Sequence, residues 1–359
     1  MTPEQDKMDN TKKPTPVTYK DAGVDIDAAN ESKSRITAHV KSTYGPSVLS
    51  DHGAFGGLFS FDKDAYDDPV LVSSADGVGT KLKLAYRSGI HDTIGEDLVN
   101  HCVNDILVMG AKPLFFLDYL ALDRMRPEVI EDIVAGIARG CKANGMSLIG
   151  GETAALPGLY NKDEYDLAGF IVGAVEKSAI LDGSRIKEGD VLIGLFSTGL
   201  HTNGYSLAQK LLFDIKRLKD NDICPGCAGT VSEELMKVHK SYLPVIKGIW
   251  DSVGPDAVKG MAHITGGGLL ENVPRILPTG VDARIKKDSW DVPPIFSTLA
   301  GLGSLPDAEA YRTFNMGIGM VLVVDKDMTE DVGTALNKLG EPFAVVGSII
   351  PGDGRCRLD

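Results

Sequence analysis

The order of apolar and polar positions predicts a chain in which short strands alternate with amphipathic helices. Apolar runs of strand length are followed by segments with apolar residues at helical spacing, as at Ile36 and Val40. Strands are expected at residues 69–76, 113–122, 146–151, 165–175, 191–197, 258–264, 315–325 and 342–350. Helices are expected at residues 27–45, 94–109, 127–144, 205–213 and 328–340, with one more after a glycine-rich turn at 266–268.

Interleaved strands and helices predict α/β or α+β layers in each half of the chain. Residues 177–190 are polar and rich in turn formers, so we expect two domains, at residues 19–178 and 179–359. Residues 1–18 are polar and contain proline, which is typical of a disordered lead-in. The prediction is weakest over residues 214–231.

Composition narrows the functional classes. The chain has 359 residues, of which 43% are hydrophobic and 24% charged, as in an ordinary globular protein. A net charge of −13 argues against a general nucleic-acid partner but leaves small anionic substrates open. No apolar run has membrane-spanning length, and the N-terminus lacks the apolar centre of a secretory signal. Five cysteines at irregular spacing favour a reducing cytoplasm over a disulfide framework.

The first candidate site is the stretch VSSADGVGTKLKLA, residues 72–85, where an apolar strand ends in Asp76 and is followed by Lys81. The spacing matches neither a Walker P-loop nor a dinucleotide-binding glycine motif. An aspartate here can hold Mg²⁺ and the lysine a phosphate. The alternative is a plain β-turn with a solvated lysine.

The helix expected at residues 94–109 carries a polar stripe on an otherwise apolar surface. Asp97, His101, Asn104 and Asp105 recur at helical spacing in it. The stripe must face a polar cavity, a partner or water, and a buried Asp105 needs a cation or hydrogen-bond donors. The alternative is an exposed amphipathic face.

A third acid, Glu152, follows two glycines directly after an expected strand. Asp76, Asp105 and Glu152 are hard oxygen ligands of the kind that suits Mg²⁺ with substrate phosphates. No cluster of histidines indicates zinc or iron. The pair Cys224 and Cys227 is interpreted as a turn with two incidental thiols.

Glycine-rich turns and loop histidines complete the candidates. GAFGGLF, with Gly56 and Gly57, can bring backbone N–H groups close to a ligand, and HITGGGLLENVP places three glycines before an expected helix. Either can instead be a plain tight turn. The loop STGLHTNGYS offers His201 and Asn203, and His263 precedes the second glycine turn. A loop histidine is often only solvated, and a histidine at a strand end is often structural.

These stretches together resemble the phosphoribosylformylglycinamidine cyclo-ligase family, also called aminoimidazole ribonucleotide synthetase, of purine biosynthesis. The resemblance covers residues 19 to about 320 in family order and departs from the commonest form in SDHGA, before Phe55. It is carried by YKDAGVDIDA, PVLVSSADGVGTKLKLA, HDTIGEDLVNHCVNDILVMGAKPLFFLDYLA, GGETAALPGLY, GDVLIGLFSTGLHTNGYSL, HITGGGLLENVPRILP and YRTFNMGIGM.

The resemblance implies a homodimer whose N-terminal mixed sheets pair into a barrel-like sheet, each with a C-terminal α/β layered domain beside it. It implies ATP and Mg²⁺, with ring closure of formylglycinamidine ribonucleotide through phosphoryl activation of the formyl amide oxygen. The metal ligands implied are Asp76, Asp105 and Glu152. The groups implied for ATP or phosphate are Thr80, Lys81, Gly56, Gly57, Gly266, Gly267 and Gly268. The groups implied for polarisation or proton transfer are His201, Asn203 and, less directly, His263.

Two other functions stay open at this point. One is another ATP-dependent enzyme of the same superfamily, such as a selenophosphate synthetase or a thiamine-monophosphate kinase. The other is a catalytically silent nucleotide-binding partner. The N-terminus lacks the reactive cysteine expected of a selenophosphate synthetase. A silent nucleotide-binding partner would have lost some of the three acids, and all three are present here.

Overall fold

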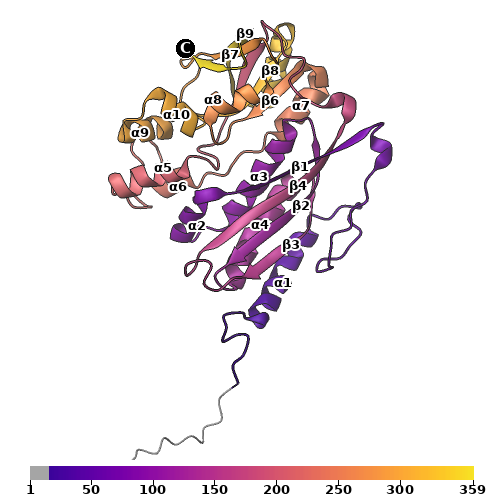
Figure 1. The fold of residues 1–359 in the computed structure, drawn as a ribbon, viewed down its shortest axis with the longest axis vertical. Helices are drawn as coiled ribbons and strands as arrows, with labels where there is room; N and C mark the ends of the chain where they lie inside the picture. Colours follow the sequence, from indigo (N-terminus) through magenta and orange to yellow (C-terminus); the bar gives the residue numbers. More distant parts are fainter. Residues whose placement is uncertain (1–15) are drawn as a thin grey trace, which may run out of the picture.

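A computed structural model describes residues 16–359 and contains two mixed sheets, one in each half of the chain (Figure 1). Most of the expected lead-in lies outside the described residues. The N-terminal half contains α1 (Ile26–Lys41), β1 (Pro69–Gly77), α2 (Leu82–Ser88), α3 (Asp92–Leu107), β2 (Lys112–Leu122), α4 (Pro127–Ala143), β3 (Ser147–Ala155) and β4 (Tyr165–Glu176). No described helix is long and apolar enough to cross a bilayer.

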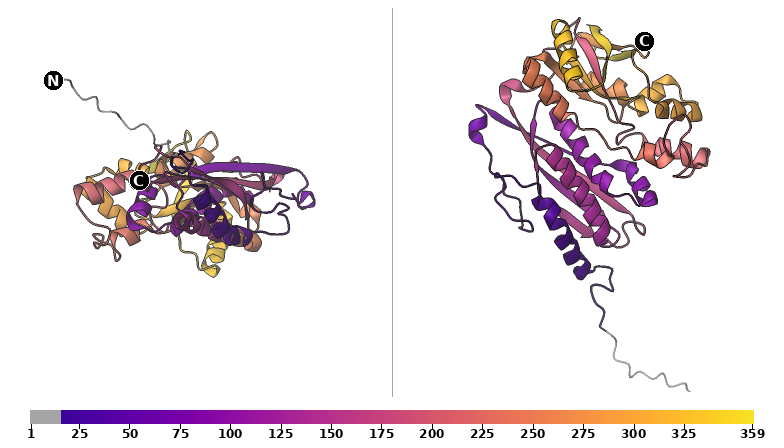
Figure 2. Two further views of the ribbon diagram at one scale, coloured as in Figure 1. Left: turned by 90° about the horizontal axis from the view of Figure 1, so that it is seen from below. Right: turned by 180° about the vertical axis from the view of Figure 1, so that it is seen from behind.

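The N-terminal sheet has the order β1-β4-β2-β3. Its β4 pairs antiparallel with both neighbours, whereas β2 and β3 run parallel. Helices α1, α3 and α4 cover one face, and within the described residues no helix covers the other (Figure 2). The covering helices follow their apolar periodicity: α4 starts at Pro127 and buries Ile130, Ile133 and Ile137 on one side.

The C-terminal sheet has the order β10-β7-β9-β5-β8-β6. Strand β8, between β5 and the edge strand β6, is buried at every residue, as its continuous apolar run requires. Its strands are β5 (Val191–Phe196), β6 (Val258–His263), β7 (Val281–Ile285), β8 (Ile318–Val324), β9 (Phe343–Pro351) and β10 (Cys356–Leu358). Its helices are α5 (Tyr205–Gln209), α6 (Val231–Leu235), α7 (Leu243–Val253), α8 (Gly268–Asn272), α9 (Pro294–Gly303), α10 (Asp307–Thr313) and α11 (Thr329–Lys338). The two-domain, mixed-sheet architecture expected from the sequence is confirmed.

Three local expectations need correction. The strand expected to end at residue 151 continues to Ala155, because β2 extends the ladder that holds it, so Glu152 lies inside β3 and not after it. The helix expected at residues 205–213 is α5 followed by a π-helical stretch, Lys210–Ile215. The short helix α2 was not expected. Within residues 214–231, an isolated bridge joins Ile223 to Thr230.

The polar stripe of α3 is where the two halves of the chain meet. Asp97 and Asn104 of the stripe, with the neighbouring Asn100, are buried and bond to residues 239–242, which belong to the C-terminal half. Asn100 donates to the carbonyl of His239, and Asp97 accepts the backbone N–H of the same residue at 2.7 Å. Asn104 donates to the carbonyl of Lys240 and accepts the backbone N–H of Tyr242. The stripe therefore satisfies backbone groups that would otherwise be buried without partners.

A fully buried ion pair completes this contact. Lys81 Nζ lies 2.7 Å from Asp97 Oδ2 and donates to the carbonyl of Lys237. Both side chains have zero exposure. Burial raises the pKa of Asp97 to about 6 and lowers that of Lys81, since each charge alone would be costly in the interior. The pair is thus a requirement of the domain contact, with neither charge tolerable without the other.

We expect Asp97→Asn to reduce the free energy of unfolding by about 3–5 kcal/mol, because it leaves the Lys81 ammonium buried without a counter-charge. Denaturant titration followed by circular dichroism measures the loss. The matched control is Asp256→Asn, which breaks an exposed pair with Arg185 and should cost less than about 1 kcal/mol. Equal losses in the two variants would contradict the role given to the pair.

Candidate active site between the two domains

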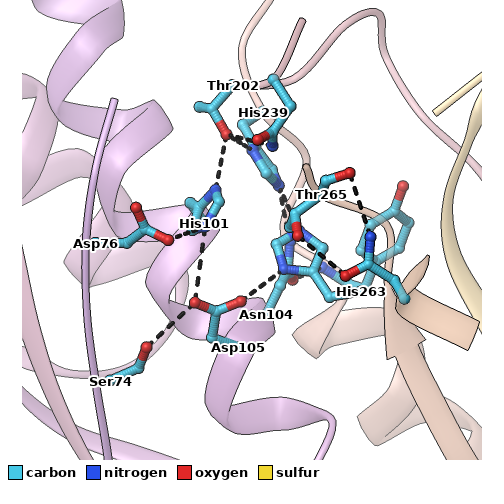
Figure 3. Close-up of polar contacts among 12 residues, drawn as sticks. Ser74, Asp76, His101, Asn104, Asp105, Thr202, His239, His263 and Thr265 are labelled. Atoms are coloured by element: carbon cyan, nitrogen blue, oxygen red, sulfur yellow. Dashed lines mark hydrogen bonds and ion pairs between the residues drawn. The ribbon is translucent and has the colours of Figure 1, made fainter. Parts of the chain in front are cut away.

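Two of the three predicted acids meet at the domain contact. Asp76, in β1, and Asp105, on α3, both approach His101, whose Nε2 lies 2.7 Å from Asp76 Oδ2 and 3.7 Å from Asp105 Oδ2 (Figure 3). Ser74 donates to Asp105 at 3.1 Å. The side chain of Asp76 is 46% exposed and that of Asp105 25% exposed. Both carboxylates therefore keep oxygen surface available to a ligand.

Histidines from both domains surround the acids. His263, at the end of β6, places Nδ1 2.8 Å from Asp105 Oδ1, and its Nε2 lies 3.1 Å from His239 Nε2. His239 stacks on His201 with 4.0 Å between ring centroids. His101 Nδ1 and His239 Nδ1 both contact the Thr202 hydroxyl, at 2.7 and 3.3 Å. The expectation that no histidines gather is wrong, because helix α3, strand β6 and the loops that carry the histidines converge only in the folded chain.

The electrostatics of the acids follow from these neighbours. Burial by itself raises the pKa of Asp76 and of Asp105. The hydrogen bond from His101 to Asp76, and that between His263 and Asp105, outweigh burial and leave both pKa values below their ordinary range. Both groups are carboxylates at neutral pH. Burial lowers the pKa of His263, and lowers those of His201 and His239 well below the ordinary value, so the uncharged ring is favoured.

The predicted loop residues lie around this cluster. Thr80 contacts Ser206 through their hydroxyls at 2.9 Å, which joins the turn after β1 to the start of α5. The amide of Asn203 is partly buried, and a Cβ added to Gly266 would stand 3.4 Å from its Oδ1. The structure thus brings Thr80, Asn203 and the first glycine of the second turn to the same region as the acids.

Gly268 has a conformational reason to be glycine. Its φ is +58°, and a Cβ at this position would lie 2.0 Å from the carbonyl oxygen of Tyr311. Gly267, with φ +96°, precedes it as the N-cap of α8. The turn is therefore fixed by close packing as well as by its backbone angles. Its predicted contact with a phosphate stays a prediction.

Glu152 lies apart from the other two acids within one chain. The register places Asp76 beside Gly169, Asp118 and Gly151 in successive strands, so Glu152, one residue on, points to the opposite face of the sheet. Three strand spacings, about 14 Å in all, separate Asp76 in β1 from Gly151 in β3. Gly57 belongs to the same edge, because a Cβ added to it would lie 2.8 Å from Ile149 of β3. Gly56 is exposed in the same loop.

Two expectations about single side chains conflict with their positions. Lys81, predicted to hold a phosphate, is instead fully buried, with its ammonium bound to Asp97 and to the carbonyl of Lys237. His201 is also fully buried, at a positive φ of 62°, and its Nε2 accepts the backbone N–H of Thr198. Both side chains are therefore buried beneath the cluster and bind other protein groups.

Residues 61–175 match the N-terminal domain model of AIR synthase related proteins, and residues 187–358 match the C-terminal domain model. A phosphoribosylformylglycinamidine cyclo-ligase of Citrifermentans bemidjiense is 53% identical over 94% of this chain and 96% of its own length. The enzyme of that name from Alkaliphilus oremlandii is 49% identical over 94% and 98%. The chain belongs to the phosphoribosylformylglycinamidine cyclo-ligase family.

Solved structures show how widely the fold of this cyclo-ligase family member is shared. A thiamine-monophosphate kinase from Stenotrophomonas maltophilia superposes with a TM-score of 0.67 at 19% identity, covering 91% of this chain and 95% of its own. The hydrogenase maturation protein HypE in complex with ATP gives 0.63 at 16% identity, covering 90% of each chain. At these identities the likeness extends to the fold alone.

Sequence reasoning about this cyclo-ligase family member missed His239 and the pairing of Lys81 with Asp97. His239 follows a segment without regular periodicity, and no motif marked it. A buried lysine is recognisable only through its partner, which lies on another helix. The turn expected at Cys224 is present, with a hydrogen bond from the backbone N–H of Cys227 to the carbonyl of Cys224, and both thiols are free.

We expect Gly268→Ala to lower the free energy of unfolding by more than about 2 kcal/mol, because it adds a clash to a left-handed backbone angle. The matched control in the same turn is Gly266→Ala, whose Cβ would make only a 3.4 Å contact. The free energy of unfolding of that variant should lie within about 1 kcal/mol of the parent value. Thermal unfolding measures both, and a Gly268→Ala variant as stable as its control would show that the turn can shift freely.

Proposed function

We propose that this chain closes the imidazole ring of formylglycinamidine ribonucleotide in an ATP-dependent reaction that yields aminoimidazole ribonucleotide, ADP and phosphate. The observation that carries the proposal is the 53% identity to a curated cyclo-ligase over 94% of the chain. The side-chain cluster adds support, because Asp76 and Asp105 meet between domains beside several histidines. Distant likeness to a kinase of the same fold does not outweigh this identity.

The reaction needs a leaving group that the substrate lacks. Transfer of the γ-phosphoryl group of ATP to the formyl amide oxygen makes that oxygen a good leaving group and releases ADP. The amidine nitrogen then attacks the same carbon, phosphate departs with the oxygen, and the nitrogen gives up a proton. The protein has to hold the two reactants in line and to neutralise charge on the phosphoryl group.

Asp76 and Asp105 fit a Mg²⁺ ion bound with ATP. Mg²⁺ is commonly held through one or two carboxylates with phosphates and waters completing its shell. Both groups are ionised at neutral pH and are partly exposed. His101 and Ser74 donate to them and orient their oxygens. When bound, the ion supplies charge neutralisation for phosphoryl transfer.

The remaining residues divide into ligand-facing and supporting groups. Asn203 and the turn at Gly266 face the same region and are our candidates for orienting the ribonucleotide and its phosphate. His263 and Asp105 form the pair that takes the proton released on ring closure. His201 holds the loop that carries Asn203.

We propose a homodimer formed through the uncovered face of the N-terminal sheet. That face carries Leu71, 64% exposed, and Phe170, 45% exposed, which a second copy would bury. The same face carries Glu152, so a partner would cover the acid that one chain leaves apart from the others. The five free cysteines support a reducing cytoplasm as the location.

We expect Asp105→Asn to lower substrate-dependent ADP release by at least about 100-fold while the protein stays folded, because it removes one of the two carboxylates at the phosphoryl group. Coupled ADP detection with formylglycinamidine ribonucleotide and Mg²⁺ measures it. Asp256→Asn, on the surface, is the control and should keep the parent rate. If Asp105→Asn turned over like the parent, or the parent released no ADP with this substrate, the proposal would fail.

We expect Phe170→Glu to convert a dimer to monomers in analytical ultracentrifugation, because it buries a charge in the proposed contact. Leu339→Glu is the matched control, since Leu339 is 47% exposed on the other domain. It should leave the mass unchanged. A monomeric parent chain, or a dimeric Phe170→Glu variant, would refute the assignment of this face.

A further inference from the structure

A chain of polar contacts links the two acids through the domain contact. From Asp76 it runs through His101, the Thr202 hydroxyl, His239 and His263 to Asp105 (Figure 3). His239 stands at its middle. Each imidazole has two nitrogens, and in the neutral ring one donates while the other accepts. The chain therefore has a direction, which depends on where the hydrogen of His239 lies.

Asn104 settles the direction at His239. Its Oδ1 accepts the backbone N–H of Tyr242 at 3.0 Å, and its Nδ2 donates to the carbonyl of Lys240 at 2.8 Å. These two backbone partners fix which end of the amide is nitrogen. The second Nδ2 hydrogen faces His239 Nε2 at 3.2 Å. That ring nitrogen must accept, so in the neutral ring the hydrogen of His239 lies on Nδ1.

The arm toward Asp76 follows from this one assignment. His239 Nδ1–H donates to the Thr202 hydroxyl, whose own hydrogen is then free for His101 Nδ1. In the neutral ring His101 Nδ1 accepts, and its Nε2 carries a hydrogen. That N–H faces Asp76 Oδ2 at 2.7 Å. The Asp76 carboxylate accepts this hydrogen, so each donor along this arm has an acceptor.

The arm toward Asp105 runs through a contact between two imidazoles. Asp105 is a carboxylate and can only accept, so His263 Nδ1, 2.8 Å from its Oδ1, donates. In the neutral ring His263 Nε2 then carries a lone pair, as does His239 Nε2 3.1 Å away. This contact therefore passes no hydrogen-bond direction to Asp105, and the direction set at His239 reaches Asp76 alone.

The ring of His239 is held on several sides. Its backbone N–H donates to Asp97, and its carbonyl accepts from Asn100. The ring stacks on His201, and the residue has no exposed surface. Reorienting it would break contacts of α3 with the C-terminal half. The hub of the chain is thus tied directly to the domain contact.

We propose that His239 is a positioning residue, which with Asn104 sets the hydrogen-bond direction through Thr202 and His101 and thereby orients Asp76 for the metal–ATP unit. The orientation of metal-ligating carboxylates by hydrogen-bond donors is a general requirement of such sites. The part that concerns the metal rests on the proposed function. The hydrogen-bond direction does not.

The first test measures the direction itself. In ¹⁵N-histidine-labelled full-length protein, long-range proton–nitrogen spectra report which ring nitrogen carries hydrogen. We expect hydrogen on Nδ1 of His239 and on Nε2 of His101, with assignments made by single histidine substitutions. Hydrogen on Nε2 of His239 would overturn the proposal whatever the enzyme's activity.

The second test compares two substitutions of His239. His239→Gln keeps an acceptor oxygen near the position of Nε2, whereas His239→Leu removes it. With Mn²⁺ and a non-hydrolysable ATP analogue, followed by electron paramagnetic resonance, we expect about tenfold weaker Mn²⁺ binding in the Leu variant. The Gln variant should stay within about threefold of the parent. kcat should fall in the Leu variant with KM for the ribonucleotide nearly unchanged.

The outcomes distinguish the positioning role of His239 from the identity of the metal ligands. Parent-like Mn²⁺ binding in His239→Leu overturns the positioning role. The role is also overturned if the Leu and Gln variants lose equal Mn²⁺ affinity and that loss parallels their loss of thermal stability. Asp76→Asn serves as the reference for the metal site itself. If Asp76→Asn left Mn²⁺ binding unchanged, the metal ligands of the proposed function would be wrong, and the positioning role would fall with them. The nitrogen spectra would still decide the direction of the chain.

Discussion

The arrangement of this protein depends on the way a helix of one domain satisfies the backbone of the other. Asp97, Asn100 and Asn104 of α3 bond to residues 237–242, and the buried pair of Asp97 with Lys81 closes the contact. Polar groups buried at such a contact tolerate few alternative arrangements, because each unmet partner costs free energy. The interface is therefore specific in register as well as in position.

Residues on the same helix contact two different regions. Asn100 and Asn104 bond to the neighbouring domain, and the residues after each of them, His101 and Asp105, lie in one cluster with Asp76. The predicted site residues accordingly form two groups. One lies at the domain contact, and the other, with Glu152 and Gly57, lies at the β3 edge of the same sheet. The barrel-like pairing implied by the family resemblance would place a second chain over that sheet.

Much of this could be predicted from the sequence, and the limits have physical causes. Long periodic helices such as α4, and apolar strands such as β8, were predicted within a few residues, since periodicity reports burial directly. Asp76 and Asp105 were identified from local pattern. The burial of Lys81 was not predicted, because the local sequence around a lysine is the same whether its ammonium faces solvent or binds Asp97. Side chains that act only through partners distant in sequence leave no local pattern.

The alternation on α3 bears on how the enzyme would lose activity on heating. A slight slip of one domain against the other would move Asn100 and Asn104 from their partners, and would carry His101 and Asp105 away from the loops they meet. Neither sheet needs to melt for this to happen. Inactivation would then begin at a lower temperature than the loss of secondary structure, with the domain seam as its origin.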